Sequence, residues 1–179
     1  MKKILLLSLC ILKLDVVSFS QEFVGAILIP TNEKVLIFAR PEKDSIGYLI
    51  NNIETDALPI INVKKIKRKY AYIIAMNSLL DTTLITGWIP LKYLGINPSN
   101  YQQIYLRETP SFKSPIINII DKPQWGDLYH FIKKRGQWVY IKTMLKSGYQ
   151  VEGWLSPVDQ AANPYTTTCY ISKNKVYRL

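Results

Sequence analysis

The side chains that could act as a nucleophile and a base are few and lie far apart in the chain. His130 is the only histidine, and Cys169 is the one cysteine beyond the first twenty residues. A thiolate–imidazole couple could use such a pair, but the carboxylates are scattered and no glycine-rich phosphate loop occurs. One thiol and one histidine cannot form a Cys/His metal cluster. The sequence therefore predicts a protein that is not an enzyme and that needs no cofactor.

Aromatic and basic side chains between residues 107 and 138 are better suited to binding. Trp125 lies in a turn with no apolar neighbours in sequence, and an aromatic residue on a loop suits stacking or a protein contact. Loop tryptophans also fold back over a core, and basic runs also form solvated hairpin tips, so both alternatives stay open. We expect a shallow groove with an aromatic side and a charged side, formed by Trp125, Tyr129 and Trp138 and by Arg107, Lys133, Lys134 and Arg135.

Part of the chain recurs, which predicts two copies of one small unit. Residues 65–73 resemble residues 133–141, and Thr86–Ile89 resembles Glu152–Leu155. Upstream, Phe38–Pro41 is aligned with Tyr105–Pro110. The three matches keep the same order at offsets of about 67 residues, which is the signature of an internal repeat.

The units are predicted to be all-β. Short β-branched or alternating runs are bounded by Pro, Gly, Asn, Asp or Lys, which is typical of strands joined by turns. Within the run 138–141, Trp138 and Tyr140 should face one side and Val139 and Ile141 the other. Each Gly-Trp pair is followed by a stretch that could form a single helical turn, at residues 91–94 and 157–160. Trp88 and Trp154 are expected in the core or at its rim.

The second copy resembles the bacterial SH3-like domain family over residues 104–158, and the first copy resembles it more weakly over residues 35–95. The resemblance implies two small SH3-like β-barrels packed in tandem, and binding to cell-wall peptide or glycan or to another protein. Arg107 matches the opening motif of the family. The motifs follow in the family's order: Tyr105–Pro110, Ile116–Ile120, Gly126–His130, Gly136–Ile141 and Gly153–Leu155.

Four segments are expected: a signal peptide (1–20), a degenerate first SH3-like domain (21–97), a second (98–160) and a C-terminal tail (161–179). The basic start, an apolar run over residues 4–12, and Ser18 and Ser20 before the expected cleavage site are typical of a secretory leader. Nine apolar residues cannot cross about 30 Å of hydrocarbon. The protein is therefore expected to be exported, periplasmic or extracellular, with no integral membrane segment in the mature chain.

The charge favours an anionic partner. The chain has a formal net charge of +10; residues 21–98 hold nine basic and seven acidic side chains, and residues 99–179 hold eleven and five. For an exported protein, nucleic acid is a poor candidate, and a basic surface suits a cell-wall polymer or an acidic envelope protein. Two functions follow: recognition of an envelope polymer, or a dedicated protein partner such as an inhibitor, an immunity factor or an assembly subunit. The sequence does not predict an oligomeric state.

Overall fold

The computed structural model describes residues 24–51, 59–77, 82–99, 102–124 and 126–161. The expected signal peptide, Trp125 and Cys169 lie outside the described residues. The described chain is all-β, as predicted. Its strands are β1 (Val24–Leu28), β2 (Thr31–Arg40), β3 (Lys43–Asn51), β4 (Pro59–Lys67), β5 (Tyr70–Asn77), β6 (Thr83–Pro90), β7 (Leu94–Pro98), β8 (Gln103–Arg107), β9 (Ile116–Asp121), β10 (Tyr129–Arg135), β11 (Trp138–Met144), β12 (Gln150–Leu155) and β13 (Gln160–Ala161). Two single 3-10 turns, η1 (Leu91–Tyr93) and η2 (Pro157–Asp159), occur where helical turns were predicted.

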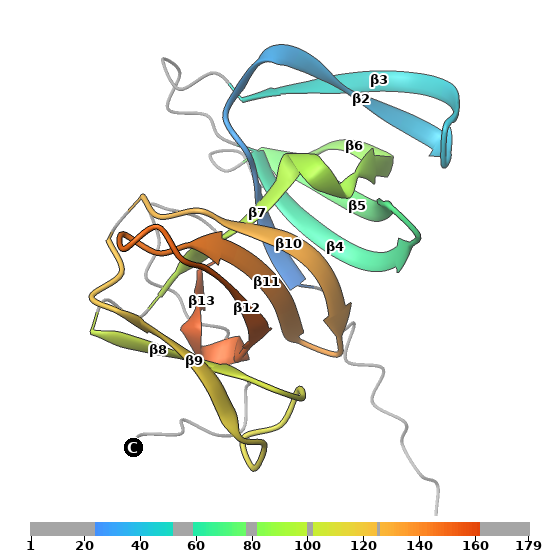
Figure 1. The fold of residues 1–179 in the computed structure, drawn as a ribbon. Helices are drawn as coiled ribbons and strands as arrows, with labels where there is room; N and C mark the ends of the chain where they lie inside the picture. Colours follow the sequence, from blue (N-terminus) through green and yellow to red (C-terminus); the bar gives the residue numbers. More distant parts are fainter. Residues whose placement is uncertain (1–23, 52–58, 78–81, 100–101, 125, 162–179) are drawn as a thin grey trace, which may run out of the picture.

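The strands form one large antiparallel sheet rather than the two closed barrels of the prediction. Their hydrogen-bonded order is β3-β2-β6-β5-β4-β1-β7-β10-β11-β12-β8-β9, and β13 pairs with β7. The path ends at β3 and at β9, so among the described strands the pairing does not close into a ring. Figure 1 shows the first-half strands β2 to β6 above the second-half strands β8 to β12.

The strand order repeats. In the first half (β1 to η1) the order is β3-β2-β6-β5-β4-β1, and in the second half (β8 to β13) it is β9-β8-β12-β11-β10, followed by β7. Each half therefore contains five strands with the same neighbours, then a 3-10 turn, then a short strand. The repeat seen in the sequence is thus a repeat of topology.

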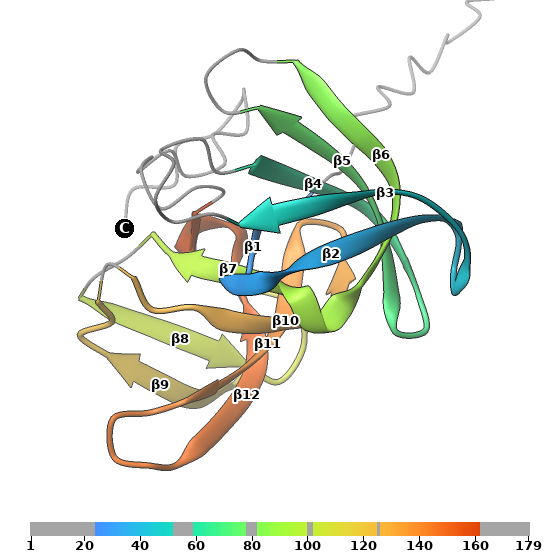
Figure 2. The same ribbon diagram turned by 90° about the horizontal axis from the view of Figure 1, so that it is seen from above.

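Strand β7 belongs to both halves. Gly95 is opposite Ile27 of β1 on one side and His130 of β10 on the other, and the end of β7 pairs with β13. All five residues of β7 are buried. The expected domain boundary at residues 97 and 98 therefore falls inside a strand that joins the halves, and Figure 2 shows β7 between the first-half and second-half strands.

The core follows the period-two pattern of the strands. Val139 and Ile141 are fully buried, while Trp138 and Tyr140 are half-buried on the opposite face, which confirms the predicted alternation. Trp88 and Trp154 are buried, and each packs edge-on against a tyrosine of the neighbouring strand. These indoles lie at the rim of the core, as expected.

One of the three repeat matches is displaced. Phe38 pairs with Trp88 and Arg107 pairs with Trp154, so the structural counterpart of Arg107 is Phe38. The alignment from sequence had instead placed Arg107 opposite Arg40. A shift of two residues in the alignment keeps every side chain on the same face of the strand, so the burial pattern alone could not reveal the shift.

The two Gly-Trp glycines are required by a close strand crossing. A Cβ at Gly87 would lie 2.6 Å from Ile37 Cγ2 and 2.9 Å from the carbonyl oxygen of Phe38, and one at Gly153 would lie 2.8 Å from Leu106 Cβ. Those distances are shorter than real Cβ contacts, and a backbone carbonyl cannot move aside cheaply. A side chain at either glycine therefore pushes two paired strands apart.

Gly87→Ala should lower the free energy of unfolding by about 1–3 kcal/mol, because its methyl group meets backbone of β2. Urea denaturation of the variant and of the wild type measures this directly. Ser147→Ala, in an exposed turn, is the control and should change stability by less than about 0.5 kcal/mol. A Gly87→Ala protein as stable as its control would contradict the close crossing.

Candidate functional site: a groove between the halves

A groove of about 740 Å³ lies where the two halves meet. The first half supplies β2, the β4–β5 hairpin and η1, and the second half supplies the middle of β10. Ligand sites commonly form at such junctions. The lining residues are Lys34, Leu36, Phe38, Glu42, Arg68, Lys69, Tyr70, Pro90, Leu91, Lys92, Tyr93, His130, Phe131 and Ile132.

The aromatic floor is positioned by short-range structure. Phe38 and Tyr70 meet edge to face with ring centroids 6.0 Å apart. The Leu91 N–H donates to the Lys69 carbonyl oxygen at 2.8 Å, which ties η1 to the β4–β5 hairpin. The Tyr93 carbonyl oxygen in turn accepts from the Ile29 N–H at 2.8 Å. Phe38, Tyr70 and Tyr93 are half-buried, so each retains ring surface for a ligand.

The rim of the groove is cationic. Lys34, Arg68, Lys69 and Lys92 line it with Glu42 as the single carboxylate. Within the described chain none of these four cations forms an ion pair. The Lys92 ammonium lies 4.7 Å from the centroid of the Tyr93 ring, at cation–π distance. The groove therefore offers apolar ring faces with unneutralised positive charge around them.

The corresponding surface of the second half has different chemistry. By strand and turn position, Ser156 stands in place of Pro90 and Asp159 in place of Tyr93. Phe112 packs on Trp138 with ring centroids 4.9 Å apart, covering the ring that corresponds to Tyr70. The second half thus lacks the aromatic floor of the first.

Two of the residues predicted to form a groove in the second half, Tyr129 and Trp138, are not brought together. Tyr129 is only 2% exposed and lies near one end of β10, whereas Trp138 is opposite Arg135 at the other end. About six residues of strand, or about 20 Å, separate those ends. Tyr129 and Trp138 therefore cannot line the same wall of the groove that was expected from Trp125, Tyr129 and Trp138.

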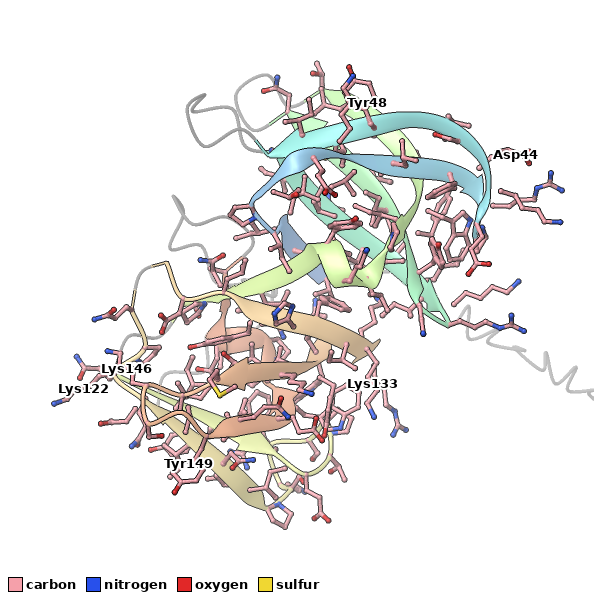
Figure 3. The ribbon with its side chains drawn as sticks, turned by 45° about the horizontal axis from the view of Figure 1, so that its top comes forward. Asp44, Tyr48, Lys122, Lys133, Lys146 and Tyr149 are labelled. Carbon is pink, nitrogen blue, oxygen red and sulfur yellow. The ribbon has the colours of Figure 1, made fainter. Side chains whose placement is uncertain are left out.

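Two of the predicted charged residues, Arg107 and Lys133, have structural partners. The Arg107 guanidinium donates to the Ser114 carbonyl oxygen at 2.7 Å and closes the β8–β9 loop. Lys133 lies over Tyr140 and Trp154, with its Nζ 4.3 Å and 5.4 Å from the ring centroids. Lys134 is half-buried and Arg135 is exposed at the hairpin end. Lys133 lies on the opposite side of the second half from Lys122 and Lys146 (Figure 3).

The Lys133 stack occurs twice. Lys65 lies over Tyr72 and Trp88 at 5.1 Å and 5.5 Å, and the register of each hairpin shifts at the matching place, between Val63 and Lys65 and between Phe131 and Lys133. Repetition in both halves indicates a role in stability. A cation over a desolvated ring contributes about 0.5–2 kcal/mol.

The comparisons with known proteins add no family. No protein-family model matches the chain, and a search of curated proteins returns no similar sequence. Among the described residues, no helix is long and apolar enough to span a membrane, and no cluster of three His, Cys, Asp or Glu side chains could hold a metal ion. His130 is exposed and lines the groove.

Part of the groove has a local signal in the sequence. Pro90 and Tyr93 frame the predicted helical turn after Gly87 and Trp88, and a tyrosine and a proline on a single exposed turn form an amphipathic surface. The contribution of β10 carried no local signal, because it depends on how the halves dock.

Tyr129 is a buried group with an unusual environment. Its hydroxyl has no hydrogen-bond partner in the described part of the chain. Burial raises the pKa of Tyr129, and the Asp127 carboxylate raises this pKa further. The folded state thus favours the neutral phenol of Tyr129. The stability that depends on this neutral phenol is fully present below the unfolded tyrosine pKa of about 10 and is lost as the pH rises above that value.

Tyr129→Phe should leave the free energy of unfolding unchanged or raise it by about 1 kcal/mol, because it removes a buried hydroxyl that has no partner. Above pH 10 the wild type should lose stability relative to the variant. Urea denaturation at neutral and alkaline pH measures both effects. The control is Tyr140→Phe, which removes a hydrogen bond to Glu152 and should be mildly destabilising. A clear loss of stability in Tyr129→Phe at neutral pH would contradict the unpartnered hydroxyl.

Proposed function

We propose that this protein is an exported, non-catalytic binding module made of two SH3-like units, and that it recognises an anionic cell-wall peptide or glycan. The observation that carries the proposal is the groove between the halves. Its floor is aromatic, and four cations surround it with one carboxylate. The tail containing Cys169 lies outside the described residues, and the groove's own residues suit binding rather than covalent chemistry.

The repeated topology supports the SH3-like assignment. Both halves have five strands with matching neighbours, followed by a 3-10 turn and a short strand, in the order that the motif resemblance implies. The two Gly-Trp motifs occupy matching strand crossings. Pairing through β7 explains how two such units can share one sheet without closing separately.

The groove suits a ligand with both flat apolar faces and negative charge. Sugar rings and peptide side chains stack on tyrosine and phenylalanine faces, and carboxylates or phosphates reach the cationic rim. Since the cations are exposed, salt weakens their attraction: the screening length falls from about 10 Å at 0.1 M to about 3 Å at 1 M ionic strength. Affinity should therefore decrease with salt without vanishing.

Binding to isolated cell-wall sacculi tests the proposal. The mature chain, residues 21–179, should sediment with sacculi at low salt and less at high salt. Tyr93→Ala should weaken retention about tenfold at either salt, because it removes one stacking face worth about 1–2 kcal/mol. The matched control is Tyr149→Ala, a tyrosine that is 73% exposed and lies outside the groove.

Two results would contradict wall recognition by the groove. The wild type could remain in the supernatant at both salt concentrations, or Tyr149→Ala could lose as much retention as Tyr93→Ala.

A second candidate function, dedicated binding of one envelope protein, is favoured by exposed apolar side chains on the first hairpin of each half. Ile46 and Tyr48 of β3 are 50% and 49% exposed, and Ile117 and Ile119 of β9 are each 46% exposed. Such patches often mark protein contacts. A stoichiometric complex with an acidic envelope protein that Ile46→Lys abolishes and Tyr93→Ala preserves would favour this function.

A further inference from the structure

A second hollow adjoins the groove. It has a volume of about 750 Å³ and lies between the end of β9, the turn before β10 and the β11–β12 hairpin. Leu128 and the β10 residues Tyr129 and His130 line it, while the β10 residues His130, Phe131 and Ile132 line the groove. His130 therefore borders both, and the β10 residues from Tyr129 to Ile132 cover about 10 Å of strand.

The second hollow is also cationic at its rim. Lys122, Lys142 and Lys146 line it with Asp121 and Asp127, and within the described chain these lysines form no ion pair. Asp127 accepts a hydrogen bond from the Gln124 N–H at 2.8 Å, so its carboxylate is engaged by its own turn. Figure 3 shows Lys122 and Lys146 at the same end of the second half.

We propose that one extended anionic polysaccharide strand occupies both hollows and crosses β10 at His130. This inference rests on the proposed function and extends it from a single groove to a continuous track. Together the two hollows present seven cations and three carboxylates. A polymer with a negative charge on each repeat can satisfy cations at both ends of the track, whereas a short ligand reaches only one end.

The strand pairing favours a polysaccharide over an acidic peptide. An extended peptide gains much of its affinity from main-chain hydrogen bonds to a free strand edge. At His130, where the track crosses β10, both edges of the strand are engaged, because Gly95 of β7 pairs with it on one side and Lys142 of β11 on the other. A sugar chain needs no such edge, and it can stack on Tyr70 and Tyr93 in the groove.

The track predicts that affinity depends on ligand length. A polysaccharide that is already bound in the groove and is long enough to enter the second hollow binds there in an effectively intramolecular step. Its overall affinity therefore rises without a change at the groove. The affinity of a short oligosaccharide that fills only the groove should not depend on the lysines of the second hollow.

Calorimetric titration with oligogalacturonates, from disaccharide to decasaccharide, tests the track at low salt. The decasaccharide should bind at least about tenfold more tightly than the disaccharide. Lys122→Gln combined with Lys146→Gln should bring the decasaccharide close to the disaccharide value and leave the disaccharide unchanged. Lys43→Gln combined with Lys113→Gln removes the same charge from exposed sites outside both hollows and should preserve the difference between the two lengths.

Each contrary outcome has a distinct meaning. Equal affinity at all lengths, or an equal loss in both double variants, would overturn the track and leave the groove intact. Tighter binding of a length-matched poly-glutamate than of the decasaccharide would overturn the polysaccharide assignment in favour of an acidic peptide. Absence of binding at every length overturns the track, and loss of the Tyr93→Ala effect on sacculi, measured separately, overturns the proposed function itself.

Discussion

The backbone pairing of β7 is the constraint on which the rest of the structure depends. This five-residue strand hydrogen-bonds to β1 of the first half and to β10 of the second half. Gly95 leaves room for the Leu128 side chain beside this pairing, because a Cβ at that position would lie 2.6 Å from Leu128 Cδ1. Without this shared strand, two short units with modest cores would be joined only by a turn.

The same pairing creates the candidate site. Because β7 fixes β10 beside η1 and the β4–β5 hairpin, His130 and Ile132 of one half lie across from Tyr70 and Tyr93 of the other. Neither half contains the groove alone. The second hollow likewise continues from β10, so the position of this strand sets the path that a long ligand would follow.

Local patterns predicted the elements well and the site poorly. The alternation of Val139 and Ile141 with Trp138 and Tyr140 predicted the inward face, and the stretches at residues 91–94 and 157–160 were correctly expected to form the helical turns η1 and η2. The match of Phe38 to Arg107 was missed, because a two-residue shift preserves alternation. The sequence predicted two closed barrels instead of one open sheet, because closure depends on strand curvature and on which strands pair with β7.

The two halves share a topology and differ in their surfaces. Tyr93 is matched by Asp159, Pro90 by Ser156 and Phe38 by Arg107, and Phe112 covers Trp138. The sequence resemblance is stronger in the second copy, which contains the predicted aromatic residues Trp125, Tyr129 and Trp138. Motif similarity follows what the fold requires, such as glycine at the strand crossing and tryptophan at the rim. A ligand surface is freer to vary, so the copy with the better motifs need not hold the site.

Residue-resolved hydrogen exchange of residues 21–179 in increasing urea tests the shared strand most directly. The amides of Gly95 and Ile96 should be protected as strongly as those of Ile73 in the first half and Ile141 in the second, and all should exchange through one common unfolding transition. Earlier exchange of the β7 amides, or separate transitions for the two halves, would contradict the account, because the groove and the hollow beside it would then have no fixed wall.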